Sequence, residues 1–203
     1  PGNPAPRRLN VRVHRITVPT PHGELCQIDE IHRRENTAWT TKHMVESRRE
    51  LEMLMSVPFE VRPGEIEQLC RREREARRKV GERGIARVGL DSPVYCISGA
   101  MPYEMFLELS ITDPDWLHEI CEEVTRRILA VLEAWWRQAR PACAFCFVGA
   151  EYCTPPMMGP QAFDDYVMPY EGRIVRWLKQ HDALAWVHCH GRVAHALEGI
   201  LRM

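Results

Sequence analysis

Hydrophobic and polar residues alternate near the start of the chain. The alternation is clearest over residues 11–18 (VRVHRITV), where its period of two is typical of a β-strand. Residues 19–23 (PTPHG) have the composition of a turn, and residues 24–28 (ELCQI) can return as a partner strand. Residues 37–41 (TAWTT) continue the β-prone composition. The pattern predicts a two- or three-stranded antiparallel excursion within residues 1–45.

The pattern then changes to one of helical signals. Ser47 followed by Glu50 forms a capping box and predicts a short helix over residues 47–55. Pro63 in a first turn and Gly81 after a last turn delimit a second helix. Proline in the first turn costs no hydrogen bond, because the first N–H groups of a helix have no partner inside it. Two helices are therefore expected before the first buried strand.

Three short, continuously apolar segments follow, and each leads through a loop into a helical pattern. The apolar segments are residues 85–90, 143–148 and 183–187. Helices are expected over residues 101–109, from Asp113 to about residue 137, from Pro160 to residue 181 with a break at Pro169, and from near Val193. Alternating strands and helices are typical of parallel β/α units, and continuously apolar strands indicate a sheet covered on both faces.

The predicted fold class is α/β: a (β/α)8 TIM barrel, present here as a partial barrel with an N-terminal antiparallel excursion. A closed barrel needs eight strands in about 250 residues, and the sequence shows three. We expect a single barrel domain over residues 1–203, with the excursion in residues 1–45 and the β/α units in residues 46–203. The chain starts at Pro1 and stops at Met203 within an amphipathic pattern, which predicts a piece of a longer protein.

The composition is that of a soluble globular protein. The chain is 45% hydrophobic and 27% charged with a formal net charge of -1, which argues against a nucleic-acid or membrane partner. A basic run at residues 71–83 is interleaved with glutamates and is expected to be a solvated helix face. The eight cysteines are scattered through apolar segments with no signal peptide ahead, which favours a reduced, cytoplasmic protein. Cys153, in a loop after Glu151, is expected to be the cysteine most open to chemistry, although an inert role is favoured even there.

The most specific candidate site is His188-Cys189-His190, at the end of the third apolar segment. Side chains alternate between the faces of a strand, so the two histidines point the same way and Cys189 points the other. If Trp186 and both histidines face a barrel interior, two imidazoles converge at the rim where barrel enzymes have their active sites. They would form half of a metal site, since a catalytic zinc needs about three protein ligands. The alternatives are hydrogen-bonded residues at a strand end and histidines that bind substrate without metal.

Carboxylates end the two preceding apolar segments. Glu151 follows the second segment and Asp91 the first, and such groups serve as general bases, metal ligands or substrate anchors. Each could equally cap the following helix or loop, but three successive strands that all end in ionisable residues favour catalytic roles for Glu151 and Asp91. Met157 and Met158, together with Tyr152, are candidates to bind substrate, although methionines are also common core residues.

The segment over residues 149–201 carries a resemblance to a known family. It has an acidic strand end, a loop that closes in a small residue and proline, a helix of the form F-x-x-[FY]-[VI]-x-P-Y-x-x-[RK]-[IV], and a strand ending H-x-H-G. These positions are Glu151, Gly159, Pro160, Phe163, Tyr166, Val167, Pro169, Tyr170, Arg173, Ile174, His188, His190 and Gly191. The sequence resembles the uroporphyrinogen decarboxylase superfamily. Residues 20–25, 37–47 and 87–93 look like its methyltransferase-like branch.

The resemblance implies a TIM barrel and suggests an activity. In the methyltransferase-like branch, a zinc held by the His and Cys of H-x-C-G and by a later Cys activates a thiol or methyl acceptor, and a corrinoid protein is the usual partner. His190 stands here at the Cys position, which departs from thiolate ligation and leaves imidazole ligation open. The expected function is metal-assisted methyl transfer from a small methylated substrate to a corrinoid or thiol acceptor. His188 and His190 would be ligands, and Glu151 the third ligand or the base.

Two alternatives stay open. The first is a cofactor-free uroporphyrinogen decarboxylase of porphyrin and heme biosynthesis, in which arginines and an aspartate hold the porphyrinogen. The tyrosine that this branch carries after residues 87–93 is not matched, because Tyr95 is too early and Tyr103 too late. The second is an inactive barrel fragment, whose exposed sheet edges would promote pairing with another chain, for example as a homodimer.

Overall fold

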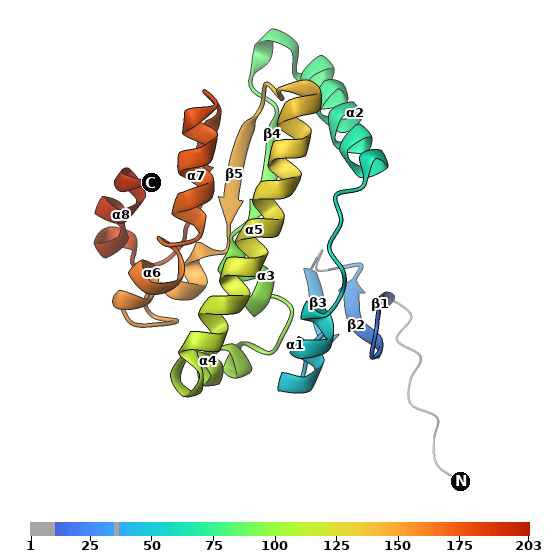
Figure 1. Ribbon diagram of the computed structural model, residues 1–203, viewed down its shortest axis with the longest axis vertical. Coiled ribbons are helices and arrows are strands. Elements are labelled where there is room, and N and C mark those ends of the chain that lie inside the picture. The colour runs from blue at the N-terminus through green and yellow to red at the C-terminus, as the bar shows by residue number, and fades with distance from the viewer. Residues whose placement is uncertain (1–10, 35–36) are drawn as a thin grey trace. The chain divides into compact units, whose positions relative to one another are not determined.

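The structure, a computed structural model, describes residues 11–34 and 37–203 and divides into two compact units (Figure 1). The meander unit comprises the chain up to Pro58 together with Ala100–Leu107. The parallel-sheet unit comprises Phe59–Gly99 and Glu108–Met203. The protein is thus a mixed α/β protein with two small sheets. The part of the predicted excursion before Val11 lies outside the described residues.

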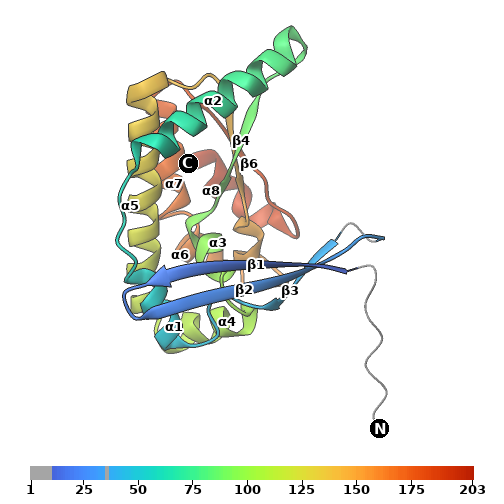
Figure 2. The same cartoon turned by 90° about the vertical axis from the view of Figure 1, so that its right-hand side faces the viewer.

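The meander unit contains an antiparallel sheet. Its strands are β1 (Val11–Thr20), β2 (Gly23–His32) and β3 (Thr37–Lys42), paired in the order β1-β2-β3. Figure 2 shows them side by side. The predicted antiparallel excursion is therefore confirmed. The turn is shorter than the sequence suggested, because Pro19 pairs with Glu24 and the edge position of β1 tolerates a proline there.

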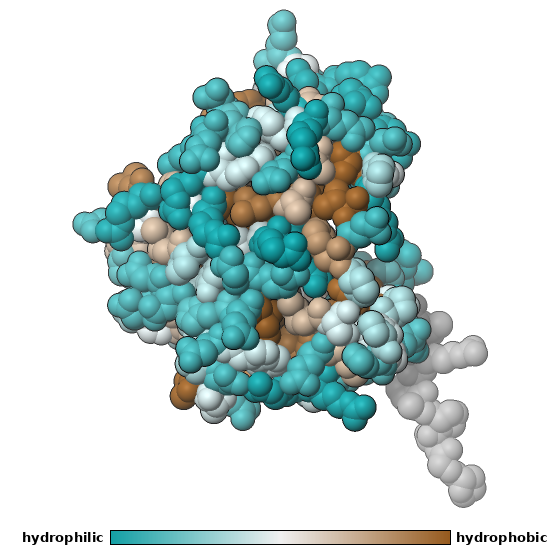
Figure 3. Space-filling model, in the orientation of Figure 1, coloured by the Kyte–Doolittle hydropathy of each residue, from teal (hydrophilic) through white to brown (hydrophobic). Residues whose placement is uncertain are grey.

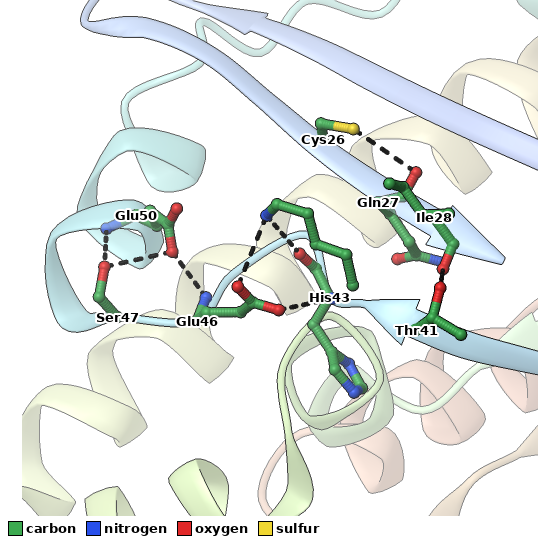
Figure 4. Close-up of polar contacts among 9 residues, drawn as sticks. Cys26, Gln27, Ile28, Thr41, His43, Glu46, Ser47 and Glu50 are labelled. Carbon is green, nitrogen blue, oxygen red and sulfur yellow. Dashed lines mark hydrogen bonds and ion pairs between the residues drawn. The ribbon is translucent and has the colours of Figure 1, made fainter. Parts of the chain in front are cut away.

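Helix α1 (Arg48–Met55) starts where the capping signal predicted. The Ser47 side chain accepts a hydrogen bond from the Glu50 N–H at 3.2 Å. The Glu50 carboxylate reaches back one residue further than expected and accepts the Glu46 N–H at 2.7 Å (Figure 4). Both bonds satisfy backbone donors that a helix start leaves without a partner. The helix buries Leu51.

The parallel-sheet unit contains the three predicted apolar strands. These are β4 (Arg87–Asp91), β5 (Ala144–Val148) and β6 (Leu184–Val187), parallel and in the order β4-β5-β6. The helices of the chain from here on are α2 (Pro63–Val80), α3 (Pro93–Ser98), α4 (Tyr103–Thr112), α5 (Pro114–Ala139), α6 (Gln161–Tyr166), α7 (Glu171–Gln180) and α8 (Leu197–Arg202). Short 3-10 turns, η1 (Gly81–Arg83), η2 (Ala150–Cys153) and η3 (Val193–Ala196), connect some of them. No helix in the described residues has the length and apolar composition to cross a membrane.

Start and stop signals explain the helix boundaries. The Asp113 carboxylate accepts the Trp116 N–H at 3.4 Å and begins α5 ahead of its first-turn proline. The break predicted at Pro169 is confirmed, because α6 ends before it and α7 starts after it. Helix α3 was not predicted, since six residues are too few to show a helical period. Its signal in the sequence was Pro93 at the first helical position after Ser92.

One face of the parallel sheet is covered and the other is open. On the covered face, Phe145 and Phe147 are fully buried, and Phe145 packs edge-on against Trp135 of α5 with ring centroids 5.8 Å apart. Figure 1 shows α5 and α7 running along β5. On the other face, Leu184 and Trp186 are 58% and 54% exposed. The sequence predicted that both faces of the sheet are covered. Among the described residues, helices cover one face, and the other exposes Leu184 and Trp186.

Apolar side chains also reach the surface beside α5, where Figure 3 shows brown atoms gathered. They line a groove of about 330 Å³ that includes Phe59, Val88, Leu90 and Ile128.

The predicted solvated face of α2 has one exception, Glu73. Its carboxylate is buried, accepts the Ala142 N–H at 3.2 Å and lies 3.6 Å from Arg77.

Candidate functional site

The carboxyl ends of the three parallel strands lie next to one another. The Ser92 N–H donates to the Val148 carbonyl at 2.8 Å, and the His188 N–H donates to the Phe147 carbonyl at 2.9 Å. Both bonds extend the pairing of the sheet one residue beyond its strands. The sequence-predicted polar residues that follow β4, β5 and β6 are therefore brought to one edge of this sheet.

The two histidines after β6 lie side by side. Their Nε2 atoms are 2.8 Å apart, and the rings stand almost perpendicular at a centroid distance of 4.5 Å. A hydrogen bond between these nitrogens requires that one ring donates and the other accepts. The same two nitrogens can instead direct their lone pairs at one metal ion. The alternation of side chains along the strand end thus gives the convergence of His188 and His190 that it predicted.

A complete metal site is not assembled. Within residues 11–34 and 37–203, no group of three or more His, Cys, Asp or Glu side chains could hold a metal ion. The structure therefore does not bring Glu151 into a ligand set with His188 and His190. The two imidazoles fit a zinc ion as nitrogen donors, and they provide two of the three protein ligands that a catalytic zinc needs.

Glu151 is held by its own loop. It lies on η2, and its carboxylate accepts the Gly149 N–H at 3.2 Å. Its carbonyl accepts the Thr154 hydroxyl at 2.9 Å. The Thr154 hydroxyl also lies 3.4 Å from the His190 carbonyl, which links this loop to the one after β6. Asp91 ends β4, and partial burial raises the pKa of its carboxyl group.

Two tyrosines accompany these carboxylates. The Tyr95 and Tyr152 ring centroids are 5.2 Å apart and the rings are inclined by 46°. Tyr95 also packs directly on Gly149, whose φ is +98°, so a Cβ at that glycine would lie 2.3 Å from the tyrosine. Burial raises the pKa of Tyr95, and the neighbouring Tyr152, Asp91 and Glu151 raise it further. Tyr152 was expected at the site from the sequence and Tyr95 was not, because the short helix α3 that carries Tyr95 shows no helical period.

A second polar pair lies buried near the edge formed by the carboxyl ends of β4, β5 and β6, which is called the rim below. Ser92 and Glu171 are fully buried, and among the described residues no hydrogen bond of ordinary geometry reaches the Ser92 hydroxyl or either carboxylate oxygen of Glu171, although that hydroxyl lies close enough to favour the charged carboxylate. Burial raises the pKa of Glu171 to about 7; the nearby Ser92 hydroxyl lowers it and the Glu151 charge raises it. Glu171 was not expected from the sequence, because a glutamate in the first turn of a helix is ordinarily a solvent-exposed residue.

The methionines and cysteines differ in their exposure. Met157 is 45% exposed and Met158 is half-buried, and both donate their N–H groups to the Thr154 carbonyl. Their role in substrate binding stays a prediction. The prediction for Cys153 was wrong: it is fully buried, and burial raises the pKa of its thiol to about 12. Cys96 is the exposed cysteine near this site.

Comparison with known proteins gives one family. A family model described as uroporphyrinogen decarboxylase (URO-D) matches residues 30–203. No curated protein and no solved structure matches the chain. The matched region includes every strand-end residue of the candidate site.

Proposed function

This chain belongs to the uroporphyrinogen decarboxylase family, and we propose that it performs metal-assisted methyl transfer from a small methylated substrate to a thiol or corrinoid acceptor. The observation that carries this proposal is the pair of imidazole nitrogens 2.8 Å apart at the end of β6. Two nitrogen donors at a strand end favour a metal-binding enzyme over a cofactor-free one, because neutral imidazoles are common zinc ligands.

We further propose that the parallel sheet is part of a TIM barrel. The support is its parallel order, the helices on one face, and the exposed Leu184 and Trp186 on the other. Apolar side chains on that face are what the packed interior of a barrel requires. The site then lies at the carboxyl ends of the strands, where barrel enzymes bind their substrates. A single barrel domain over residues 1–203 stays a prediction.

Each residue has a proposed task. His188 and His190 would hold a zinc ion through Nε2, and bound zinc would keep an acceptor thiol deprotonated. Glu151 would accept the proton that this thiol releases, since its carboxylate is oriented by the Gly149 N–H. Asp91, at the end of β4, would bind the substrate on the side of the site opposite the two histidines. A separate protein would carry the corrinoid where the acceptor is a corrinoid.

The decarboxylase alternative has the family description in its favour. That reaction needs cationic groups to hold the carboxylates of a porphyrinogen. Apart from His188 and His190, the residues that the structure gathers at the rim are acidic or aromatic: Asp91, Glu151, Tyr95 and Tyr152. This composition favours the methyl-transfer proposal.

Metal content tests the proposal. We expect the purified protein to bind about one zinc ion, and His188→Ala and His190→Ala to abolish that binding. The matched control is His22→Ala, at an exposed histidine in the meander unit, which should retain the zinc. An active preparation that holds no metal, or one that converts uroporphyrinogen to coproporphyrinogen, would overturn the proposal.

A further inference from the structure

The rim of the parallel sheet carries carboxylates next to aromatic rings. Asp91 pairs with Val148 in the β4–β5 register, and Val148 directly precedes Gly149. The Glu151 carboxylate accepts the Gly149 N–H. Tyr95 packs on that same glycine and lies 5.2 Å from the Tyr152 ring. Two carboxylates and two tyrosine rings therefore surround one backbone segment.

This combination is suited to a cationic ligand. The face of an aromatic ring attracts a positive charge, and methylated ammonium groups are recognised in this way by aromatic side chains. A carboxylate beside the rings adds direct charge attraction. An anionic ligand would meet repulsion from the Asp91 and Glu151 carboxylates, and a neutral ligand would desolvate them without compensation.

A separate observation indicates a polar group beside the rim whose interactions are incomplete. Glu171 and the Ser92 hydroxyl are fully buried without a hydrogen-bond partner in the described residues. Ser92 follows Asp91 directly and donates its N–H to the Val148 carbonyl, so the buried pair adjoins the rim. A buried carboxyl group without a partner is costly. A cation bound at the adjoining rim would reduce that cost by charge attraction.

Ion pairs with arginine or lysine do not supply this charge among the described residues. In the part of the chain that the structure describes, no Arg or Lys forms an ion pair with Asp91, Glu151 or Glu171. Arg87 lies on the same face of the sheet but at the opposite end of β4, where its Nη1 is 3.4 Å from the Cys146 sulfur.

We infer that the site binds a methyl donor whose methyl group sits on a quaternary ammonium centre. The inference deepens the proposed function and depends on it for the reaction. In that reaction the carbon–nitrogen bond breaks with its electron pair left on nitrogen, which releases a neutral tertiary amine. The thiolate electron pair forms the new carbon–sulfur bond, and the thiol proton goes to Glu151. A cationic donor favours this step, because its leaving group departs uncharged.

The test compares two small molecules of the same shape. Choline carries a quaternary ammonium group, and 3,3-dimethyl-1-butanol replaces that nitrogen with carbon and has no charge. Titration calorimetry of the purified protein at constant ionic strength should show choline binding at least roughly tenfold more tightly. Asp91→Asn, Glu151→Gln and Tyr95→Leu should each weaken choline binding by roughly fivefold or more.

A matched control is Asp164→Asn, at an exposed acidic residue of α6, which should leave choline binding unchanged. Thermal melts identify any variant that is unfolded, and the three rim variants provide independent readings. Equal affinity for the two molecules overturns the inference, as does preferential binding of uroporphyrin, a polycarboxylate. Because the titration needs neither metal nor acceptor, a failure of methyl transfer with choline selectivity intact would remove the proposed function and leave the substrate class standing.

Discussion

Two glutamates of the meander unit and one glutamate of the parallel-sheet unit have opposite surroundings. In the meander unit, the Glu46 carboxylate accepts the His43 N–H at 3.1 Å and lies 3.7 Å from the Lys42 ammonium, and Glu50 accepts two further donors (Figure 4). In the parallel-sheet unit, Glu171 is fully buried with both carboxylate oxygens unpartnered. The first group needs nothing from outside the protein. Glu171 is buried without hydrogen bonds, which costs folding free energy, and such groups are concentrated at binding and catalytic sites.

The largest effect on stability is expected from Gly149→Ala. Tyr95 packs on this residue, and the Gly149 N–H donates to the Glu151 carboxylate. The substitution forces a Cβ to 2.3 Å from Tyr95 and places alanine at a φ of +98°. Strain and overpacking together should lower the free energy of unfolding by about 4 kcal/mol. Urea denaturation measures it.

The control for this change is Gly159→Ala, where an added Cβ has no atom within 4 Å. It should alter the stability by less than about 0.5 kcal/mol. Equal effects at the two glycines would show that Tyr95 is not packed on the Gly149 backbone.

The next effect concerns Glu171→Gln and depends on pH. Burial raises the pKa of Glu171 from 4.5 to about 7 in the folded protein. The folded state therefore favours the protonated carboxyl group, so this contribution to stability is complete below the unfolded pKa and is lost as the pH rises through 7. The total loss is up to about 3 kcal/mol.

A glutamine stays uncharged, so the variant should be more stable than the wild type at about pH 8.5 and similar to it at about pH 5. Thermal melts across this range measure the difference. Glu119→Gln, at an exposed residue of α5, provides the control and should show no such pH dependence. Parallel stability curves for the wild type and Glu171→Gln would show that the carboxyl group is solvated or partnered.

The same contrast separates what the sequence could predict from what it could not. Local signals gave the meander, the helix starts at Ser47 and Asp113, and the parallel strands, because each depends on residues close in sequence. The convergence of His188 and His190 followed from strand geometry. The burial of Glu171 could not be predicted, since it depends on helix α7 packing against a strand end about 80 residues earlier in the chain.

Ser47→Ala should have a moderate effect, because it removes a polar group that has a partner. The Ser47 hydroxyl accepts the Glu50 N–H at the start of α1, and losing such a cap costs about 1 kcal/mol. Chemical denaturation monitored by circular dichroism should detect the change. Arg49→Ala, at the neighbouring exposed position of the same helix, should be close to neutral. A loss at Arg49 as large as that at Ser47 would contradict the capping role.

The smallest effect is expected from Ser92→Ala, although Ser92 also stands at the N-cap of a helix. Its side chain makes no capping hydrogen bond, and its buried hydroxyl has no partner in the described residues. Removing an unsatisfied buried hydroxyl should change the free energy of unfolding at about pH 5 by less than about 0.5 kcal/mol, or even increase it. The Ser92 hydroxyl lowers the pKa of Glu171, so its removal should raise that pKa further, and the loss of stability with rising pH should be slightly larger and continue to slightly higher pH. A loss equal to that of Ser47→Ala would mean that Ser92 has a partner in solution, and the contrast between the two acidic groups would then disappear.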